Sequence, residues 1–331
     1  MKKLMNAPGD FVDQALDGLT LANPSLVRDG ENGRVIRRAD GARKGKVGVA
    51  SGGGSGHLPL FTGYVGKGLL DTCSIGNVFE GPNVGSCMDA IRLADGGRGV
   101  LRLYGNYGGD RMNFDMAGEM LEDEIRTTTV LGTDDIASAS PEEIAKRRGV
   151  AGIIYAYKIA GAKAETGADL DEVTATAAKA VAATRTIGVA LAPCQVPGSA
   201  KPTFTLGDDE IEMGMGIHGE PGIWRNKLRS ADEIADEMLQ RLLAETPKNA
   251  GSEVSILVNG LGATPLEELF ILYRRASQKL SAAGFSIVQP LVGNYVTSME
   301  MAGVSISLCF LDEELKSMLA APAYCPFWRV G

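Results

Sequence analysis

The chain has 331 residues, of which 33 are basic and 41 acidic, so its formal net charge is −8. This negative charge disfavours a non-specific grip on nucleic acid, and no run of about 18 apolar residues is present that would cross a membrane. The five cysteines are scattered without a C-x-x-C pair, which argues against a disulfide framework or zinc site and predicts a cytoplasmic protein with small-molecule or protein partners.

Short apolar segments rich in β-branched residues alternate with helical patterns, which is typical of α/β domains with largely parallel or mixed sheets. The predicted strands are 46–50, 99–104, 126–131, 187–191, 254–260, 286–292 and 304–310. Capping-box patterns at 140–143, 230–233 and 264–267 predict helix starts, and the alanine-rich segment 169–184 predicts a further helix.

A polar stretch follows the strand 187–191, and the length fits two domains of about 150 residues each. We therefore predict two α/β domains, 1–184 and 185–331. Open α/β sheets bind ligands at the carboxyl ends of their strands, so the substrate site is expected at strand ends near the seam between the domains.

The chain contains only two histidines, and each lies in a glycine-rich frame: His57 in SGGGSGHLP and His218 in GMGIHGEPG. Flanking glycines remove side chains and let a small ligand approach both backbone and imidazole, so the pattern favours ligand contact over a packing role. The first frame follows strand 46–50 and predicts a glycine turn over 52–56 at the end of that strand.

The glycine-rich segments do not match the common nucleotide motifs. The frame around His57 lacks the lysine of a P-loop and the third glycine of a dinucleotide fingerprint. The segment GLGATP at 260–265 has Pro265 in place of that third glycine, so a turn between a strand and a helix is the simpler interpretation. We expect this chain to bind no cofactor itself.

A third candidate is LYGNYGGD at 103–110, where a strand ends in a turn that carries Asp110. An aspartate after two glycines is often only a turn residue. Beside two glycine-framed histidines, however, a carboxylate at another strand end is a candidate general base for a hydroxyl.

The segments SGGGSGH, NVFEGP, GNYGGD, GMGIHGEPGI and GLGATPLEEL resemble, in order and approximate spacing, the K domain of the dihydroxyacetone kinase family. The resemblance covers almost the whole chain and implies a homodimeric, two-domain α/β subunit that holds a short ketose. It implies that a ring nitrogen of His218 adds to the substrate carbonyl as a hemiaminal, and that Asp110 accepts the proton of the attacking terminal hydroxyl. It also implies that His57 polarises the substrate, and that the amides of Gly53 and Gly54 hold sugar oxygens.

In that family a helical L domain or subunit supplies ATP or ADP with Mg²⁺, and in one branch a phosphotransferase-system phosphoprotein regenerates the nucleotide. Phosphoryl transfer depends on such charge neutralisation, for which this chain offers no motif. The resemblance therefore implies a donor on another polypeptide.

The chain departs from the family at Leu58, Gly81 and Gly105, where glutamate, serine and lysine are usual. The two lost polar groups at 81 and 105 predict a pocket for a larger or branched ketose such as erythrulose or apulose, with Glu80 receiving an extra hydroxyl. Neutral exchange away from the sugar is the other interpretation. Arg102 is a candidate replacement for the lost cation, unless its strand position turns it to the opposite face.

Relatives of this subunit also act as ketose-sensing coregulators without catalysis. The presence of His57, Asp110 and His218 together favours the kinase, because a sensor has no use for a general base. Turnover with a helical partner would distinguish the two classes.

Overall fold

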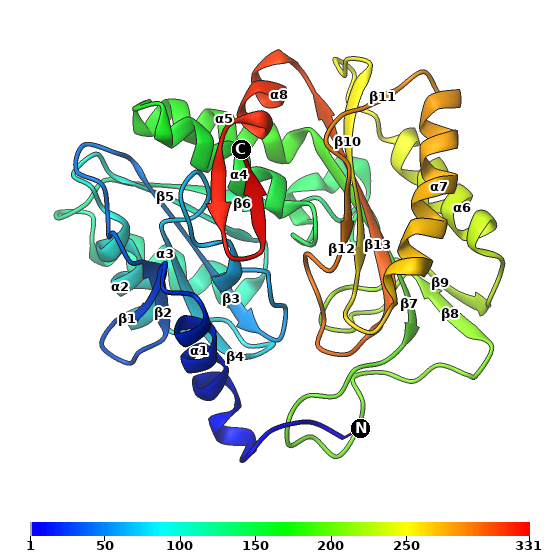
Figure 1. Cartoon of the computed structure of the whole chain (residues 1–331), viewed down its shortest axis with the longest axis horizontal. Coiled ribbons are helices and arrows are strands. Elements are labelled where there is room, and N and C mark those ends of the chain that lie inside the picture. The colour runs from blue at the N-terminus through cyan, green and yellow to red at the C-terminus, as the bar shows by residue number, and fades with distance from the viewer. Residues whose placement is uncertain (1) are drawn as a thin grey trace. The chain divides into compact units, whose positions relative to one another are not determined.

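The computed structural model describes residues 2–331, and they form two compact units (Figure 1). The first holds the described residues up to 132 together with 154–179 and 317–331, and the second holds 133–153 and 180–316. The boundary predicted after residue 184 lies close to one of these crossings. The sequence does not anticipate the other crossings, because segments distant in sequence complete each unit.

The first unit is built on a six-stranded sheet with the order β1-β2-β4-β3-β5-β6. Its strands are β1 (Leu26–Asp29), β2 (Val35–Arg38), β3 (Gly48–Ser55), β4 (Thr72–Val78), β5 (Val100–Gly105) and β6 (Thr127–Gly132). The pairs β4-β3, β3-β5 and β5-β6 are parallel, whereas β1-β2 and β2-β4 are antiparallel. The strands β3, β4 and β5 therefore end at the same edge of the sheet.

The helices of this region begin with α1 (Phe11–Ala22), α2 (Val84–Ala94) and α3 (Gly108–Met120), followed by α4 (Ile153–Glu165) and α5 (Leu170–Ala182). The chain returns through α8 (Glu313–Ala320) to a hairpin of β14 (Ala323–Cys325) and β15 (Trp328–Val330). Apolar side chains of α2 and α3 pack in one cluster with β3 and β5, in which the Tyr104 and Phe114 rings stack at 4.4 Å between centroids. This packing fixes α3 against the sheet.

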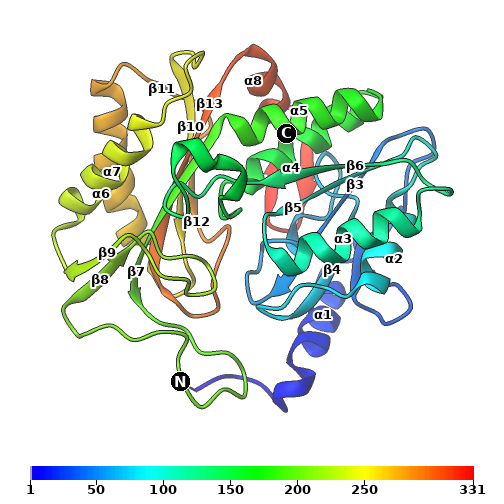
Figure 2. The ribbon, with the colours of Figure 1, turned by 180° about the vertical axis from the view of Figure 1, so that it is seen from behind.

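The second unit has a seven-stranded sheet with the order β11-β10-β13-β7-β8-β9, and β12 also pairs with β10. Its strands are β7 (Thr184–Ala192), β8 (Glu210–Met213), β9 (Trp224–Lys227), β10 (Glu253–Gly260), β11 (Ser286–Ile287), β12 (Leu291–Gly293) and β13 (Ala302–Leu311). The helices α6 (Ala231–Ala244) and α7 (Leu266–Ala282) lie side by side (Figure 2) and share one apolar core with the sheet. Both sheets are mixed, which confirms the predicted fold class. The first has mainly parallel pairs, whereas the second is antiparallel from β10 through β13, β7 and β8 to β9.

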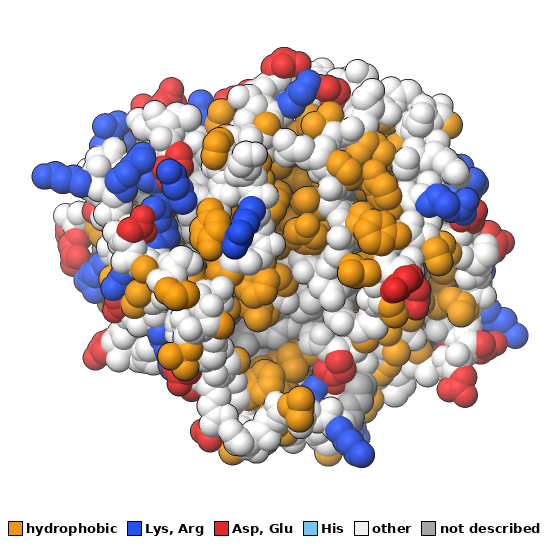
Figure 3. All heavy atoms as spheres, in the orientation of Figure 1, with side chains coloured by type: hydrophobic (Ala, Val, Ile, Leu, Met, Phe, Trp, Pro, Cys, Tyr) orange, Lys and Arg blue, Asp and Glu red, His pale blue; other side chains and the backbone are white. Residues whose placement is uncertain are grey.

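The surface over α7 carries hydrophobic side chains (Figure 3), and Leu266, Phe270 and Ile271 are about half exposed. Such apolar faces are typical of interaction surfaces.

None of the helices in residues 2–331 is long and apolar enough to span a membrane.

Two strand predictions need correction. The strand predicted at 46–50 continues to Ser55, so Gly52, Gly53 and Gly54 lie in β3 and do not form the predicted turn. The strand predicted at 286–292 is divided into β11 and β12, and Gln289 between them has a φ of +48°. A left-handed residue before Pro290 interrupts the extended backbone there.

The three predicted capping boxes have different outcomes. Ser230 and Glu233 form both bonds of the box at the start of α6. Thr264 precedes α7 but bonds to the backbone of Gly303 instead. The segment after Ser140 forms only a short 3₁₀ helix, Pro141–Lys146, so an α-helix there was wrong. The local sequence pattern alone does not decide whether a capping box forms, because tertiary partners compete for the same side chains.

Candidate functional site

His57 follows β3 through Gly56, whose φ of +98° suits glycine. The imidazole is only 1% exposed. It stacks on the ring of Phe79 at 4.9 Å and meets the ring of Phe61 edge-on at 6.2 Å. Two aromatic rings therefore fix the orientation of this histidine.

The same two aromatic residues explain why glycines precede His57. A Cβ on Gly53 would lie 2.1 Å from the ring of Phe61, and a Cβ on Gly54 would lie 2.9 Å from the Cα of Phe79. Both glycines are thus required for the packing that holds His57. Their predicted role as amide donors to sugar oxygens stays a prediction.

The segment after β4 connects His57 with Asp110. Phe79, with a φ of +63°, packs on the histidine, and a Cβ on Gly81 would lie 2.5 Å from Oδ1 of Asp110. Between them, Glu80 is exposed and its carboxylate accepts a hydrogen bond of 3.1 Å from the side chain of Asn77. Three of the predicted site residues, at 57, 81 and 110, are therefore brought together around one short loop.

Asp110 lies in the first turn of α3 and is 7% exposed. The strand β5 ends at Gly105, so only two residues separate the strand from the helix, and the predicted flexible turn is short. The positive end of the helix dipole favours an ionised carboxylate at this position.

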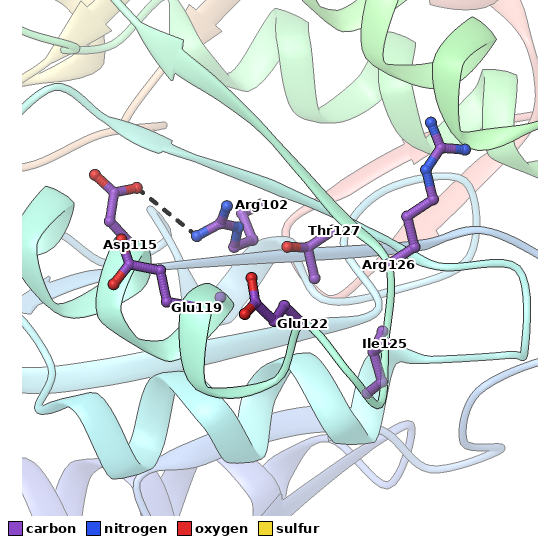
Figure 4. Close-up of a pocket in the computed structure, with 8 residues that line it drawn as sticks. Arg102, Asp115, Glu119, Glu122, Ile125, Arg126 and Thr127 are labelled. Atoms are coloured by element: carbon purple, nitrogen blue, oxygen red, sulfur yellow. Dashed lines mark ion pairs between the residues drawn. The ribbon is translucent and has the colours of Figure 1, made fainter.

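Arg102 was the candidate replacement for the lysine that is usual at residue 105, but its side chain does not turn toward Gly105. Its Nη1 donates to the carbonyl of Phe114 at 2.5 Å and lies 3.7 Å from Oδ1 of Asp115. Figure 4 shows this guanidinium pointing to Asp115 across a hollow beside α3. A Cβ on Gly118 would lie 2.3 Å from the same nitrogen, so Arg102 is committed to anchoring α3.

His218 lies in the loop 214–223 that joins β8 to β9. The loop is closed at its base by the amide of Ile223, which donates to the carbonyl of Met213 at 2.7 Å. The amide of Gly222 donates to Oε1 of Glu212, also at 2.7 Å. This loop is therefore hydrogen-bonded to its own hairpin.

Glu220 is the principal partner of His218 in this loop, and the sequence prediction missed it. Its Oε1 lies 3.0 Å from Nδ1 of His218, and its Oε2 accepts the backbone N–H of His218 at 2.9 Å. A signal was present, since an acidic residue two positions after a loop histidine can reach the ring from the same turn.

The charge state of Glu220 follows from its surroundings. Burial raises the pKa of this carboxyl, but the hydrogen bond and charge of His218 and the charge of Arg148 outweigh burial and lower the pKa to about 2. An ionised carboxylate only accepts hydrogen bonds, so Nδ1 of His218 carries the proton. In the neutral ring the lone pair is then on Nε2, the nitrogen available for nucleophilic chemistry.

His57 and Asp110 belong to the first compact unit and His218 to the second. Within residues 2–331, the structure shows no group of three or more His, Cys, Asp or Glu side chains arranged to hold a metal ion.

Residues 17–327 match the family model described as the Dak1 domain. The chain is 44% identical over 330 residues to the PTS-dependent dihydroxyacetone kinase 1, dihydroxyacetone-binding subunit DhaK, of Listeria innocua, covering 99% of this chain and 100% of that protein. It is 43% identical over 338 residues to the L-erythrulose 1-kinase of Mycolicibacterium smegmatis, covering all of this chain but 58% of that protein.

Among solved structures, the dihydroxyacetone kinase operon co-activator Dha-DhaQ superposes with a TM-score of 0.89 at 34% identity, covering 96% of this chain and 98% of that one. The family match, the two kinase relatives and the shared fold agree with one another. This chain belongs to the Dak1 domain family.

Proposed function

We propose that this chain is the ketose-binding catalytic subunit of a dihydroxyacetone-kinase-type phosphotransferase. It holds a short ketose as a hemiaminal on His218 while a separate donor subunit phosphorylates the terminal hydroxyl. The observation that carries this proposal is the contact of His218 with an ionised Glu220, because it leaves Nε2 with the lone pair that carbonyl addition needs.

In the capture step, Nε2 of His218 forms a bond to the carbonyl carbon, and the π electrons of the carbonyl move to its oxygen, which takes up a proton. The ring passes its Nδ1 proton to solvent by way of the carboxylate of Glu220, so the adduct gains one proton on oxygen, loses one from the ring and stays neutral. Glycerol has no carbonyl carbon to attack. Ketoses are therefore separated from polyols by bond formation.

In the transfer step, Asp110 accepts the proton of the terminal hydroxyl as that oxygen attacks the phosphorus of the donor, and the bond from phosphorus to the leaving oxygen breaks. His57, held between Phe61 and Phe79, hydrogen-bonds and polarises the ketose. A helical L subunit would hold Mg²⁺ with ATP, or with ADP that is rephosphorylated in place, and the nucleotide and metal would supply the phosphoryl group and neutralise its charge. Where ADP is bound, a phosphotransferase-system phosphoprotein would rephosphorylate it.

The ketose is dihydroxyacetone or a larger or branched relative such as erythrulose or apulose. The contact of Gly81 with Asp110 supports a role for this departure in the site, since a side chain there would press on the carboxylate. Glu80 is exposed on the same loop and is the proposed partner of an additional hydroxyl. On the family resemblance alone, we further propose a homodimer, a cytoplasmic location and a place in glycerol metabolism.

A ketose-sensing coregulator is the second candidate, favoured by the likeness to the operon co-activator. The presence of Asp110 beside Gly81 supports the kinase instead, because sensing needs at most the covalent anchor.

The test combines two measurements on untagged protein, so that His57 and His218 supply the only imidazole signals. ¹⁵N-imidazole NMR is followed during titration with dihydroxyacetone, erythrulose, apulose and glycerol, and phosphorylation is assayed with a helical L subunit and Mg-ATP or a phosphoprotein donor. We expect a ketose, and not glycerol, to shift His218 and to be phosphorylated. Capture without turnover under any donor would favour the sensor, and no response to any ketose would refute hemiaminal capture.

A further inference from the structure

We propose that Arg148 is a positioning residue for ketose capture, which holds the carboxylate of Glu220 and through it the proton on Nδ1 of His218. The inference deepens the proposed function and rests on it for the reaction. It concerns four residues of the second compact unit, namely Asp135, Arg148, His218 and Glu220.

Arg148 connects a buried carboxylate to the loop that carries His218. Its Nε donates to Oδ2 of Asp135 at 3.0 Å, and its Nη2 forms an ion pair with the same oxygen at 2.8 Å. Its Nη2 also lies 3.4 Å from the carbonyl of Gly214, the first residue of the loop, and its Nη1 lies 3.7 Å from Oε2 of Glu220. The guanidinium therefore contacts both the start of the loop and the acidic partner of the histidine.

The anchor of this arginine is rigid. Asp135 is 2% exposed and accepts the backbone N–H of Ala137 at 3.0 Å. Its neighbour Asp134 accepts the amides of Val150 and Gly152 at 3.0 and 2.8 Å, which ties the chain just after Arg148 to the segment that carries Asp135. Because both carboxyl groups are bonded to backbone, the guanidinium is held in one place.

The loop is shaped to let Arg148 and Glu220 meet. A Cβ on Gly216 would lie 2.1 Å from Oε2 of Glu220 and 2.5 Å from Nη1 of Arg148. The backbone φ of Gly216 is outside the left-handed region, so glycine is needed here for space and not for conformation. An alanine would push the carboxylate aside without removing any charge.

The consequence for chemistry is that the Nδ1 proton of His218 depends on a residue that does not touch the ketose. An acceptor carboxylate fixes a histidine tautomer only if it is itself ionised and oriented, as in metal sites where an outer carboxylate orients a ligating histidine. Without the charge of Arg148, only the contacts with His218 itself orient the partly buried carboxylate of Glu220. We expect this weaker hold to let the ring exchange its proton between the two nitrogens.

The test uses Arg148→Gln, which removes the charge, and Gly216→Ala, which displaces the carboxylate. ¹⁵N-imidazole NMR of the free, untagged protein reports the tautomer of His218 before any ketose is added. At a pH where the ring is neutral, we expect His218 in the wild type to carry its proton on Nδ1, and both variants to show a mixture of the two tautomers. The dissociation constant for the best ketose should rise about tenfold in each variant, as when a residue that orients a ligating histidine is lost.

Arg147→Gln is the matched control, because Arg147 is the adjacent buried arginine and its guanidinium pairs with Glu245, at 2.6 and 2.8 Å. This control should keep the His218 tautomer and the ketose affinity. If either Arg148→Gln or Gly216→Ala folds and retains the wild-type tautomer and affinity, the inference is overturned. The free-protein spectra decide it even if the wild type captures no ketose, in which case only the proposed function fails.

Discussion

Gly81 lies directly against the carboxyl group of Asp110, since a Cβ at residue 81 would come within 2.5 Å of its Oδ1. Asp110 is 7% exposed and sits in the first turn of α3, which leaves it little room to withdraw. The absence of a side chain at residue 81 therefore sets the position of the proposed general base.

We expect Gly81→Ala to lower kcat for ketose phosphorylation by about tenfold to a hundredfold, because displacement of a reacting group by about 1 Å has effects of that size. Capture of ketose by His218, followed by ¹⁵N NMR, should remain. Gly18→Ala is the control, since a Cβ on this helical glycine would meet no described heavy atom within 4 Å beyond its chain neighbours and its own helix backbone. An unchanged kcat in Gly81→Ala would contradict the role given to this contact.

The stacking of Phe79 on His57 predicts a second effect. Phe79→Leu removes an aromatic pair of the kind that contributes about 1 kcal/mol, and it releases one side of the imidazole. The KM for ketose should rise several-fold, and the His57 signals in the NMR spectrum should broaden or move. Phe285→Leu is the comparison, because it breaks a similar pair with Phe310 in the other compact unit. Unchanged His57 signals would show that Phe79 does not orient this ring.

The sequence suggests candidate site residues wherever a polar side chain lies next to several glycines. His57, Asp110 and His218 became candidates in this way, because the sequence alone offers few structural reasons for glycines around a polar side chain. The structure supplies one such explanation for Gly53 and Gly54, which make room for Phe61 and Phe79. A glycine motif does not by itself distinguish ligand approach from close packing.

The sequence could not predict contacts between segments that lie far apart in the chain. Glu220 lies two residues from His218, which lowers its pKa most, but Arg148, from a segment far earlier in the chain, also lowers it. The crossings of the chain between the two compact units have the same origin. Long-range contacts of this kind leave no periodic pattern, because each depends on the fold that it helps to build.

The serines before two similar segments provide a matched test of capping. Ser230 accepts the amide of Glu233 and forms a complete capping box at α6, whereas Ser140 makes no side-chain cap to its short 3₁₀ helix. Ser230→Ala should lower the free energy of unfolding by about 1 kcal/mol, and Ser140→Ala should change it by less than about 0.5 kcal/mol. Urea unfolding of both variants checks this. Equal losses would mean that the pattern S-x-x-E alone determines the stabilisation.

The low pKa of Glu220 predicts how stability depends on pH. Because the pKa in the folded protein is about 2, below the ordinary value of 4.5, ionised Glu220 stabilises the fold above the ordinary pKa, and this contribution is lost as the pH falls toward 2. Glu220→Gln should therefore be less stable than the wild type by about 1–2 kcal/mol at neutral pH, allowing for partial exposure of the side chain.

That difference should shrink as urea unfolding of the two proteins is repeated from pH 7 down to pH 3, because protonation of Glu220 in the unfolded wild type then favours unfolding. Glu122→Gln, which alters an exposed glutamate in the other compact unit, should give a small difference at every pH. A gap between Glu220→Gln and the wild type that stays constant over this range would mean that Glu220 acts through packing. The ionised acceptor assigned to Nδ1 of His218 would then have to be abandoned, and with it the reason for placing the lone pair on Nε2.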